Sequence, residues 1–184
     1  MKPALIVIDI QNDYFPGGKM ELEGSAQAGA QAAKLLDAFR KKGLPLVHVQ
    51  HLSTRPGAGF FVPDTEGANI HSCVAPLSGE TVVQKNFPNS FRGTPLLEIL
   101  RGSDIDHLVI AGMMTHMCVD ATTRAAFDLG FSCSLAHDAC ATRAVAFGDQ
   151  SVPAAQVHVA FLAALNGLYA KVQSTATLAG EFAA

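Results

Sequence analysis

Cys118 is the residue of this chain best placed for covalent chemistry. It follows the apolar run 108–112, which is typical of a buried strand, and a helical pattern continues from it to Leu129 before Gly130. Backbone N–H groups at the start of a helix have no intrahelical partner. These N–H groups and the positive end of the helix dipole together favour a thiolate over a thiol at Cys118. We therefore predict that Cys118 is a nucleophile rather than a core side chain.

Two charged residues stand at the ends of other predicted strands. Asp9 lies within the apolar run 4–10, where a carboxylate is costly to bury without partners, and Lys85 ends the run 81–84. Either residue alone has an ordinary interpretation, as a turn anchor or as a solvated lysine. In a parallel sheet, however, sites form beyond the carboxyl ends of strands, near the point where the strand order reverses. The three residues together therefore favour a catalytic site.

The elements that must position these residues alternate along the chain between strand and helix. Apolar runs predict strands at 4–10, 46–50, 81–84, 107–111, 131–136 and 168–172. Helical patterns occupy 25–42, 94–102, 118–129 and 151–167, and a short helical tail follows. Ser25 and Thr94 are the expected N-caps of the first two helices, and Gly43 is the expected stop of the first. The irregular stretch 52–79 is long enough to indicate a segment that covers or lines a pocket.

This alternation predicts a Rossmann-like α/β fold with three layers, α/β/α, around a six-stranded parallel sheet. In the strand order 3-2-1-4-5-6, the first and fourth strands are neighbours, so Asp9 and Cys118 should lie side by side. The third strand lies two strands away from the first. Lys85 must therefore reach the site with its long side chain, or through a reversal of the chain in 86–92.

Composition narrows the class of protein. At 184 residues the chain is predicted to be one domain, 1–184. Hydrophobic residues make up 49% and charged residues only 16%, which favours apolar surface buried in a homo-oligomer. A net charge of −3 gives no electrostatic reason to expect nucleic acid as a partner. No apolar stretch is long enough to span a membrane, so no membrane partner is expected either. The start of the chain shows no signal peptide, and its 4 cysteines form no Cys-x-x-Cys pair, so we expect a cytoplasmic protein.

Three stretches around the candidate residues resemble the isochorismatase-like cysteine hydrolases. They are 8–15 (IDIQNDYF), 85–91 (KNFPNSF) and 112–119 (GMMTHMCV). The resemblance covers nearly the whole chain and implies a six-stranded parallel sheet with helices on both sides. It also implies that Asp9, Lys85 and Cys118 form a catalytic triad that hydrolyses small amides.

The chemistry that the resemblance implies divides among these residues. Asp9 takes the thiol proton as general base, and Lys85 stabilises the anionic pair. The thiolate of Cys118 attacks a carbonyl, and the backbone N–H groups of Met114 and Cys118 receive the oxyanion. Members of the family often have a non-proline cis peptide before the residue equivalent to Met114, and that bond turns the N–H inward.

Neither a metal ion nor another cofactor is expected. Nicotinamidases that resemble this chain carry an Asp-x-His metal motif after the second strand, where this chain has His51-Leu52-Ser53. Although His48 and His51 look like a ligand pair, residues three apart on a strand point to opposite faces. Four residues are candidate contacts for a small-molecule substrate: Phe15, His51, Arg92 and His116. Each also has a structural interpretation, which is the commoner one for a phenylalanine and for an arginine.

The sequence therefore predicts a cysteine hydrolase that cleaves the C–N bond of a small non-peptide amide or ureido compound through a thioester. Two alternatives remain. One is an isochorismatase that cleaves a vinyl ether, although members of that branch generally lack the nucleophilic cysteine. The other is a non-catalytic oligomeric binding protein that retains the fold, although an intact set of Asp9, Lys85 and Cys118 argues against it.

Overall fold

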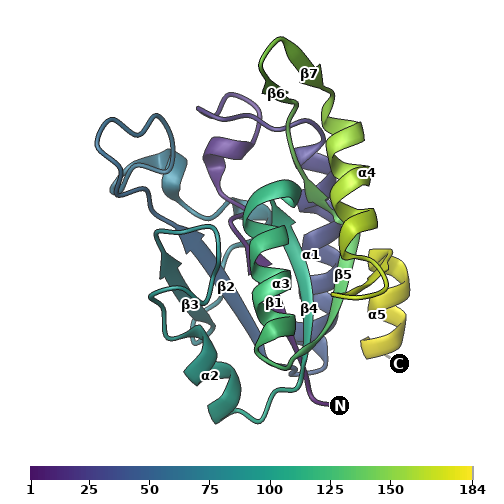
Figure 1. The fold of residues 1–184 in the computed structure, drawn as a ribbon. Helices are drawn as coiled ribbons and strands as arrows, with labels where there is room; N and C mark the ends of the chain where they lie inside the picture. The colour runs from purple at the N-terminus through teal and green to yellow at the C-terminus, as the bar shows by residue number, and fades with distance from the viewer. Residues whose placement is uncertain (184) are drawn as a thin grey trace.

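Six parallel strands form one sheet in the order β3-β2-β1-β4-β5-β8 in the computed structural model, which describes residues 1–183 (Figure 1). The strands are β1 Pro3–Ile8, β2 Leu46–His51, β3 Thr81–Lys85, β4 His107–Met113, β5 Ser132–Ala141 and β8 Lys171–Gln173. The predicted fold class and strand order are confirmed, with β8 as the sixth strand. The order reverses between β1 and β4, where ligand sites of such sheets form.

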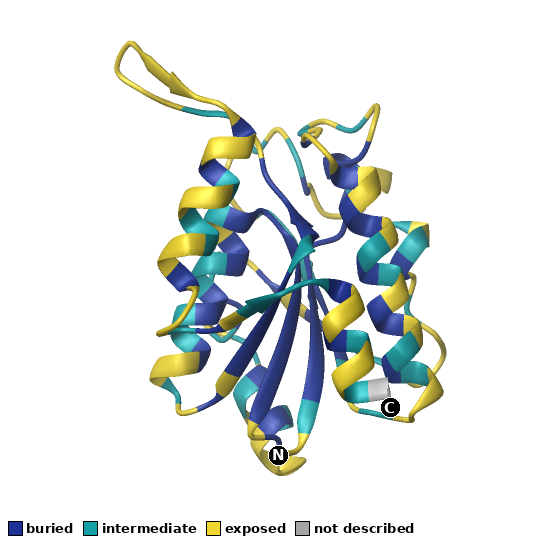
Figure 2. Ribbon diagram, turned by 90° about the vertical axis from the view of Figure 1, so that its right-hand side faces the viewer, coloured by how far each residue is buried: buried dark blue, intermediate teal, exposed yellow. Residues whose placement is uncertain are grey.

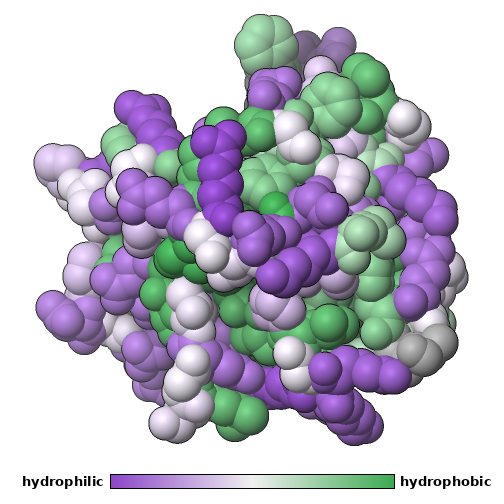
Figure 3. Space-filling view, turned by 90° about the horizontal axis from the view of Figure 1, so that it is seen from below, coloured by the Kyte–Doolittle hydropathy of each residue, from purple (hydrophilic) through white to green (hydrophobic). Residues whose placement is uncertain are grey.

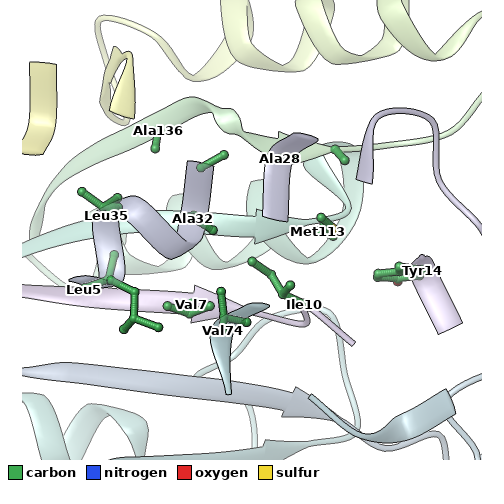
Figure 4. Packing of buried hydrophobic residues seen from close by; sticks show 14 of the residues in the cluster. Leu5, Val7, Ile10, Tyr14, Ala28, Ala32, Leu35, Val74, Met113 and Ala136 are labelled. Carbon is green, nitrogen blue, oxygen red and sulfur yellow. The ribbon is translucent and has the colours of Figure 1, made fainter. Parts of the chain in front are cut away.

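Helices cover both faces of this sheet. They are α1 Ser25–Lys41, α2 Leu96–Gly102, α3 Asp120–Asp128, α4 Ala154–Leu165 and α5 Thr175–Ala183. Because successive strand residues point to opposite faces, β1 contributes to two separate cores. Leu5 and Val7 pack with α1 and α5 on one face (Figure 4), and Ile6 packs with α2 and α3 on the other. The strands at the centre are consequently buried along most of their length (Figure 2). Within residues 1–183, none of the helices combines the length and the apolar character that crossing a bilayer requires.

Several element ends differ from the sequence predictions. The first strand stops at Ile8 rather than residue 10, because Asp9 adopts a left-handed backbone conformation with φ 51°. Ser25 lies inside α1, and Gly24, with φ 73°, is the N-cap instead. The predicted end of this helix is correct, since Gly43 has φ 63° and its N–H binds the Arg40 carbonyl. The predicted N-cap Thr94 is wrong by one residue, because α2 begins at Leu96 and its N-cap is Pro95, although the Thr94 hydroxyl accepts from the Leu96 N–H at 3.3 Å.

A small antiparallel hairpin was not predicted. Strands β6 Val145–Phe147 and β7 Gln150–Val152 pair with each other and extend away from the rest of the molecule (Figures 1 and 2). Gly148, with φ 60°, stands in the two-residue turn between them. The prediction that the following helix opens at Ser151 is therefore wrong. That residue pairs in β7, and α4 begins only after Pro153, at Ala154.

The stretch 52–79 is irregular, as predicted, apart from two short 3₁₀ turns, Glu66–Ala68 and Ser72–Val74. Residues that follow β1 hold it in place. The Gln11 side chain donates to the carbonyls of His51 and Ala68 at 2.9 and 2.8 Å. Asp13, which is buried, accepts from the Phe61 N–H at 2.6 Å. These contacts fix the stretch beside the carboxyl ends of β1 and β2.

Candidate active site

The three predicted catalytic residues meet at the carboxyl end of the sheet. Lys85, the last residue of β3, extends its side chain past β2 to the end of β1. Its Nζ donates to Asp9 Oδ2 at 2.7 Å and to Cys118 Sγ at 3.2 Å, and also to the Phe87 carbonyl at 3.1 Å. The side chain thus spans the gap of two strands by its own length. The predicted convergence of these residues is present in the structure.

Asp9 is held by an unusual backbone geometry. It is completely buried, and its N–H donates to the Val49 carbonyl of β2 at 3.0 Å while its φ is 51°. Aspartate tolerates this left-handed region better than most residues do. Within residues 1–183, its Oδ1 has no hydrogen-bond partner, so this oxygen of the carboxylate is left without a donor.

The close approach of β1 and β4 behind Asp9 depends on a glycine. Gly112 pairs with Ile8 and has φ 143°, a conformation that residues with a side chain rarely adopt. A methyl group added to Gly112 would lie 2.1 Å from the Ile8 carbonyl oxygen. Gly112 therefore sets the spacing of the two strands that carry Asp9 and Cys118.

Cys118 lies on a π-helical turn, Thr115–Val119, that joins β4 to α3. The predicted helix start at Cys118 is therefore wrong, because α3 itself begins at Asp120. The carbonyl of Met114 accepts from the N–H groups of Met117 and Val119 at 3.0 and 3.3 Å, and the Met113–Met114 peptide is cis. Met114 and Cys118, the expected oxyanion donors, are thus on one tight turn. Their role remains a prediction.

The electrostatics of the resting site favour a thiol. Burial raises the pKa of Cys118, the carboxylate of Asp9 raises it further, and the ammonium of Lys85 opposes both. The expectation that the helix start yields a resting thiolate is therefore wrong. Burial lowers the pKa of Lys85, but Asp9 and Cys118 outweigh that effect and the net pKa is raised. The site consequently holds an ammonium between a carboxylate and a thiol.

His51 is a fourth member of this cluster. It is the last residue of β2, and its Nδ1 lies 2.9 Å from Lys85 Nζ and 3.9 Å from Asp9 Oδ2. Burial and the charge of Lys85 lower its pKa to about 4, so the ring is neutral at pH 7. Its side chain is 18% exposed, whereas the side chains of Asp9 and Lys85 are 0% exposed and Cys118 is buried. His51 is thus the member of the cluster that is most open to solvent.

Three residues of this cluster are of types that also ligate metal ions. Asp9, His51 and Cys118 each offer one ligand atom, and these atoms lie within 4.8 Å of one another. Lys85 Nζ, however, lies 2.7, 2.9 and 3.2 Å from these three atoms and already places a positive charge among them. A metal at bond lengths of about 2.0–2.3 Å could enter only if the ammonium moved away. The donor set therefore fits an ammonium better than a metal ion.

The other three candidate substrate contacts lie in ordinary surroundings. Phe15 belongs to the core beside α1, and its ring stacks on His71. The exposed guanidinium of Arg92 lies 3.7 Å above the centre of the Phe87 ring. His116 is hydrogen-bonded through Nδ1 to the hydroxyl of Thr142. Substrate contact by these residues remains a prediction.

Two residues near the cluster were not singled out by the sequence. Tyr14 is buried. Burial raises its pKa, the negative charges of Asp9 and of Cys118 in its ionised form raise it further, and Arg143 opposes them. Arg143, which follows β5, also contributes to lowering the pKa of His116, where burial is the larger cause. Tyr14 does lie within the stretch 8–15 that resembles the hydrolase family, whereas Arg143 lies outside all three motifs and carries no sequence signal.

The chain is similar to known proteins in both sequence and fold. The isochorismatase domain model matches residues 3–177. The isochorismatase family protein YddQ of Bacillus subtilis, itself uncharacterized, is 52% identical over 175 residues, which are 95% of this chain and 97% of YddQ. A crystal structure assigned as an isochorismatase hydrolase, from Oleispira antarctica, is 52% identical with a TM-score of 0.94, over 97% of this chain and 96% of that one. Maleamate amidohydrolase of Pseudomonas putida is 33% identical over 144 residues, which are 71% of this chain and 68% of that enzyme.

Proposed function

This chain belongs to the isochorismatase family and is a hydrolase, and on that premise we propose that it cleaves the C–N bond of a small non-peptide amide or ureido compound. The observation that carries the proposal is the contact of one buried ammonium, Lys85 Nζ, with both Asp9 Oδ2 and Cys118 Sγ. A carboxylate, an ammonium and a thiol from three separate elements are the parts that nucleophilic attack by sulfur requires. The amidohydrolase activity of the maleamate relative supports this proposal.

The first half-reaction makes a thioester. Cys118 Sγ attacks the substrate carbonyl as its proton passes to the carboxylate of Asp9, whose Oδ1 has no other partner within residues 1–183. The oxyanion is received by the N–H groups of Met114 and Cys118. Asp9 then returns the proton to the leaving nitrogen, the C–N bond breaks, and ammonia or an amine departs. Because the resting thiol has a raised pKa, sulfur deprotonation and attack are coupled rather than separate.

The second half-reaction consumes water. Asp9 accepts a proton from the water molecule while the oxygen of that water attacks the thioester carbonyl. The carbon–sulfur bond breaks, the carboxylic acid leaves, and the proton returns to Cys118. Throughout the cycle Lys85 stays protonated and stabilises whichever of Asp9 and Cys118 is charged, which its raised pKa supports.

The two alternative functions predict different results for Cys118. Vinyl ether cleavage by acid chemistry does not use a nucleophilic thiol, and a non-catalytic binding protein turns nothing over. A nucleophilic cysteine therefore favours the amidase over both. Ammonia release should be measured over small primary amides, carbamoyl acids and ureido acids, with hydroxylamine added to trap the thioester as a hydroxamate.

In this assay, Cys118→Ala should lose roughly 10⁴-fold or more of the activity. Cys73→Ser is the matched control, because this thiol is half-buried in the core beside α1 and lies outside the cluster. The control variant should keep its activity and its hydroxamate signal. Ammonia release that persists in Cys118→Ala would contradict the proposed mechanism.

A homo-oligomer in the cytoplasm is part of the same proposal. The segment 144–165, which holds the β6–β7 hairpin and α4, contains one charged residue, Asp149. Phe147 and Val159 in it are 92% and 64% exposed, and Figure 2 shows this hairpin exposed along most of its length. On the face seen from below, by contrast, apolar areas are interspersed among polar side chains (Figure 3). An apolar surface with a single charged residue suits association with an identical copy, because it brings few like charges together. Light scattering should show a smaller particle for Phe147→Glu, and an unchanged mass would contradict the proposal.

A further inference from the structure

The contact between Lys85 and His51 determines which nitrogen of the imidazole carries the proton. An ammonium group has three N–H groups and only donates, and four acceptors lie within 3.2 Å of Lys85 Nζ, so they share its hydrogens. Because Nδ1 of His51 lies 2.9 Å from this positively charged nitrogen, it must direct a lone pair towards it rather than an N–H. A nitrogen that accepts carries no proton. Since the ring is neutral at pH 7, its single proton is on Nε2.

The protonated nitrogen lies on the open side of the cluster. Within residues 1–183, Nε2 of His51 makes no hydrogen bond, and it is not among the buried polar atoms that lack a partner. The ring of Phe61, whose centre lies 5.8 Å from that of His51, borders it on one side. His51 is also more exposed than the three catalytic side chains. A substrate that approaches Cys118 therefore meets an N–H donor whose orientation is fixed from behind by Lys85.

We propose that His51 is a substrate-recognition residue, whose Nε2–H donates to a second acceptor group next to the scissile amide. The substrate class is then an amide that also carries a carboxylate or carbonyl, such as a monoamide of a dicarboxylic acid or a ureido acid. This inference rests on the proposed function, because it assigns the specificity of the same site.

The surroundings of the site agree with an anionic group on the substrate. Arg143 contributes to lowering the pKa of both Tyr14 and His116, so a positive charge stands near the same end of the sheet. The net pKa of Tyr14 is nonetheless raised, first by burial and then by Cys118 and Asp9, so its hydroxyl stays protonated and can donate. Donors and a cation together favour an acceptor-bearing substrate over a purely apolar amide.

Two variants of His51 separate substrate recognition from support of Lys85. In His51→Asn the side-chain oxygen can take the place of Nδ1 and accept from Lys85, while the outward donor is lost. In His51→Gln the longer side chain can place its NH₂ near the former Nε2 position and restore that donor. The preference for an acid amide over its uncharged analogue should therefore be lost in His51→Asn and kept in His51→Gln.

The assay compares substrates in pairs in which a methyl group replaces the carboxylate. Suitable pairs are maleamate with cis-crotonamide, succinamate with butyramide, and N-carbamoylglycine with N-ethylurea. For the best pair, the ratio of kcat/KM between acid and methyl analogue should fall about tenfold or more in His51→Asn. In His51→Gln the ratio should stay within about threefold of wild type. An equal loss on both members of the pair would overturn the inference, because His51 would then act only through Lys85.

A measurement without substrate keeps this inference distinct from the proposed function. Nitrogen-15 NMR of the imidazole ring reports which nitrogen is protonated, and at pH 7 it should show Nε2–H for His51. A ring protonated on Nδ1 in an active enzyme would overturn the inference alone. Absence of ammonia release from every pair would overturn the proposed function, and the inference with it.

Discussion

Replacement of Lys85 by methionine tests the central contact of the site through protein stability. Methionine keeps much of the volume of the aliphatic stem but removes the ammonium. Asp9 would then remain as a completely buried carboxylate, with Oδ2 deprived of its partner at 2.7 Å and Oδ1 already without one in the described part of the chain. The structure therefore predicts that Lys85→Met leaves one uncompensated charge inside the protein.

The magnitude follows from the cost of breaking a buried ion pair. Removal of one partner typically destabilises a protein by about 3–5 kcal/mol. For a chain of this length, roughly 2–4 °C of melting temperature corresponds to 1 kcal/mol, so the melting point should fall by about 6–20 °C. The double variant with Asp9→Asn removes both charges, and asparagine tolerates the φ of 51° at that position. It should recover about 2–3 kcal/mol relative to Lys85→Met alone.

Urea unfolding followed by circular dichroism, at fixed protein concentration and pH 7, measures these differences. Lys171→Met is the matched control, because Lys171 forms an ion pair with Glu181 at 3.0 Å but its side chain is 67% exposed. Solvent screens such exposed pairs and they contribute little to stability, so this variant should unfold close to wild type. The reasoning is refuted if Lys85→Met is as stable as wild type, or if the double variant is less stable than Lys85→Met.

Two further predictions concern the scaffold around the site. Gly112→Ala should destabilise the protein by at least about 3 kcal/mol, because its methyl would lie 2.1 Å from the Ile8 carbonyl oxygen at a φ of 143°. Gly102→Ala, with open space around the added methyl, should stay within about 1 kcal/mol of wild type in the same urea titration. The second concerns Glu80, whose pKa is lowered to about 2, chiefly by hydrogen bonds from Arg40 at 2.7 and 2.8 Å. A depressed carboxyl pKa contributes stability that is present above the ordinary value of 4.5 and is lost as pH falls from 4.5 towards 2. Glu80→Gln should therefore cost about 1–3 kcal/mol at neutral pH and flatten the dependence of unfolding free energy on pH in that window. An unchanged slope would show that the ion pair contributes little.

Much of the fold was determined by local features of the sequence. Apolar runs alternate with helical patterns, and such alternation specifies a parallel sheet with helices on both faces. In that topology the carboxyl ends of strands meet at one edge, so Asp9, Lys85 and Cys118 could be placed together without coordinates. Errors at element ends came from backbone conformations that residue type does not reveal. The left-handed φ of Asp9 is one example.

The hairpin β6–β7 was missed for a related reason. Its strands are 3 residues each and make an isolated pair that no helix within residues 1–183 covers (Figure 2). Periodic patterns need longer windows than this, and the Pro153 that opens α4 made the preceding residues look like part of the helix.

What the sequence by itself determined is thus the architecture and the convergence of Asp9, Lys85 and Cys118 at one edge of the sheet, because periodicity and strand-end position are local properties. The tertiary structure alone decided how those side chains are charged and which neighbour they share. The thiol of Cys118 has a raised pKa rather than the lowered one expected at a helix start, because burial and Asp9 prevail over Lys85. His51 contacts Lys85 although 34 residues separate them. Such effects depend on desolvation and on distances between residues remote in sequence, and no local pattern encodes either.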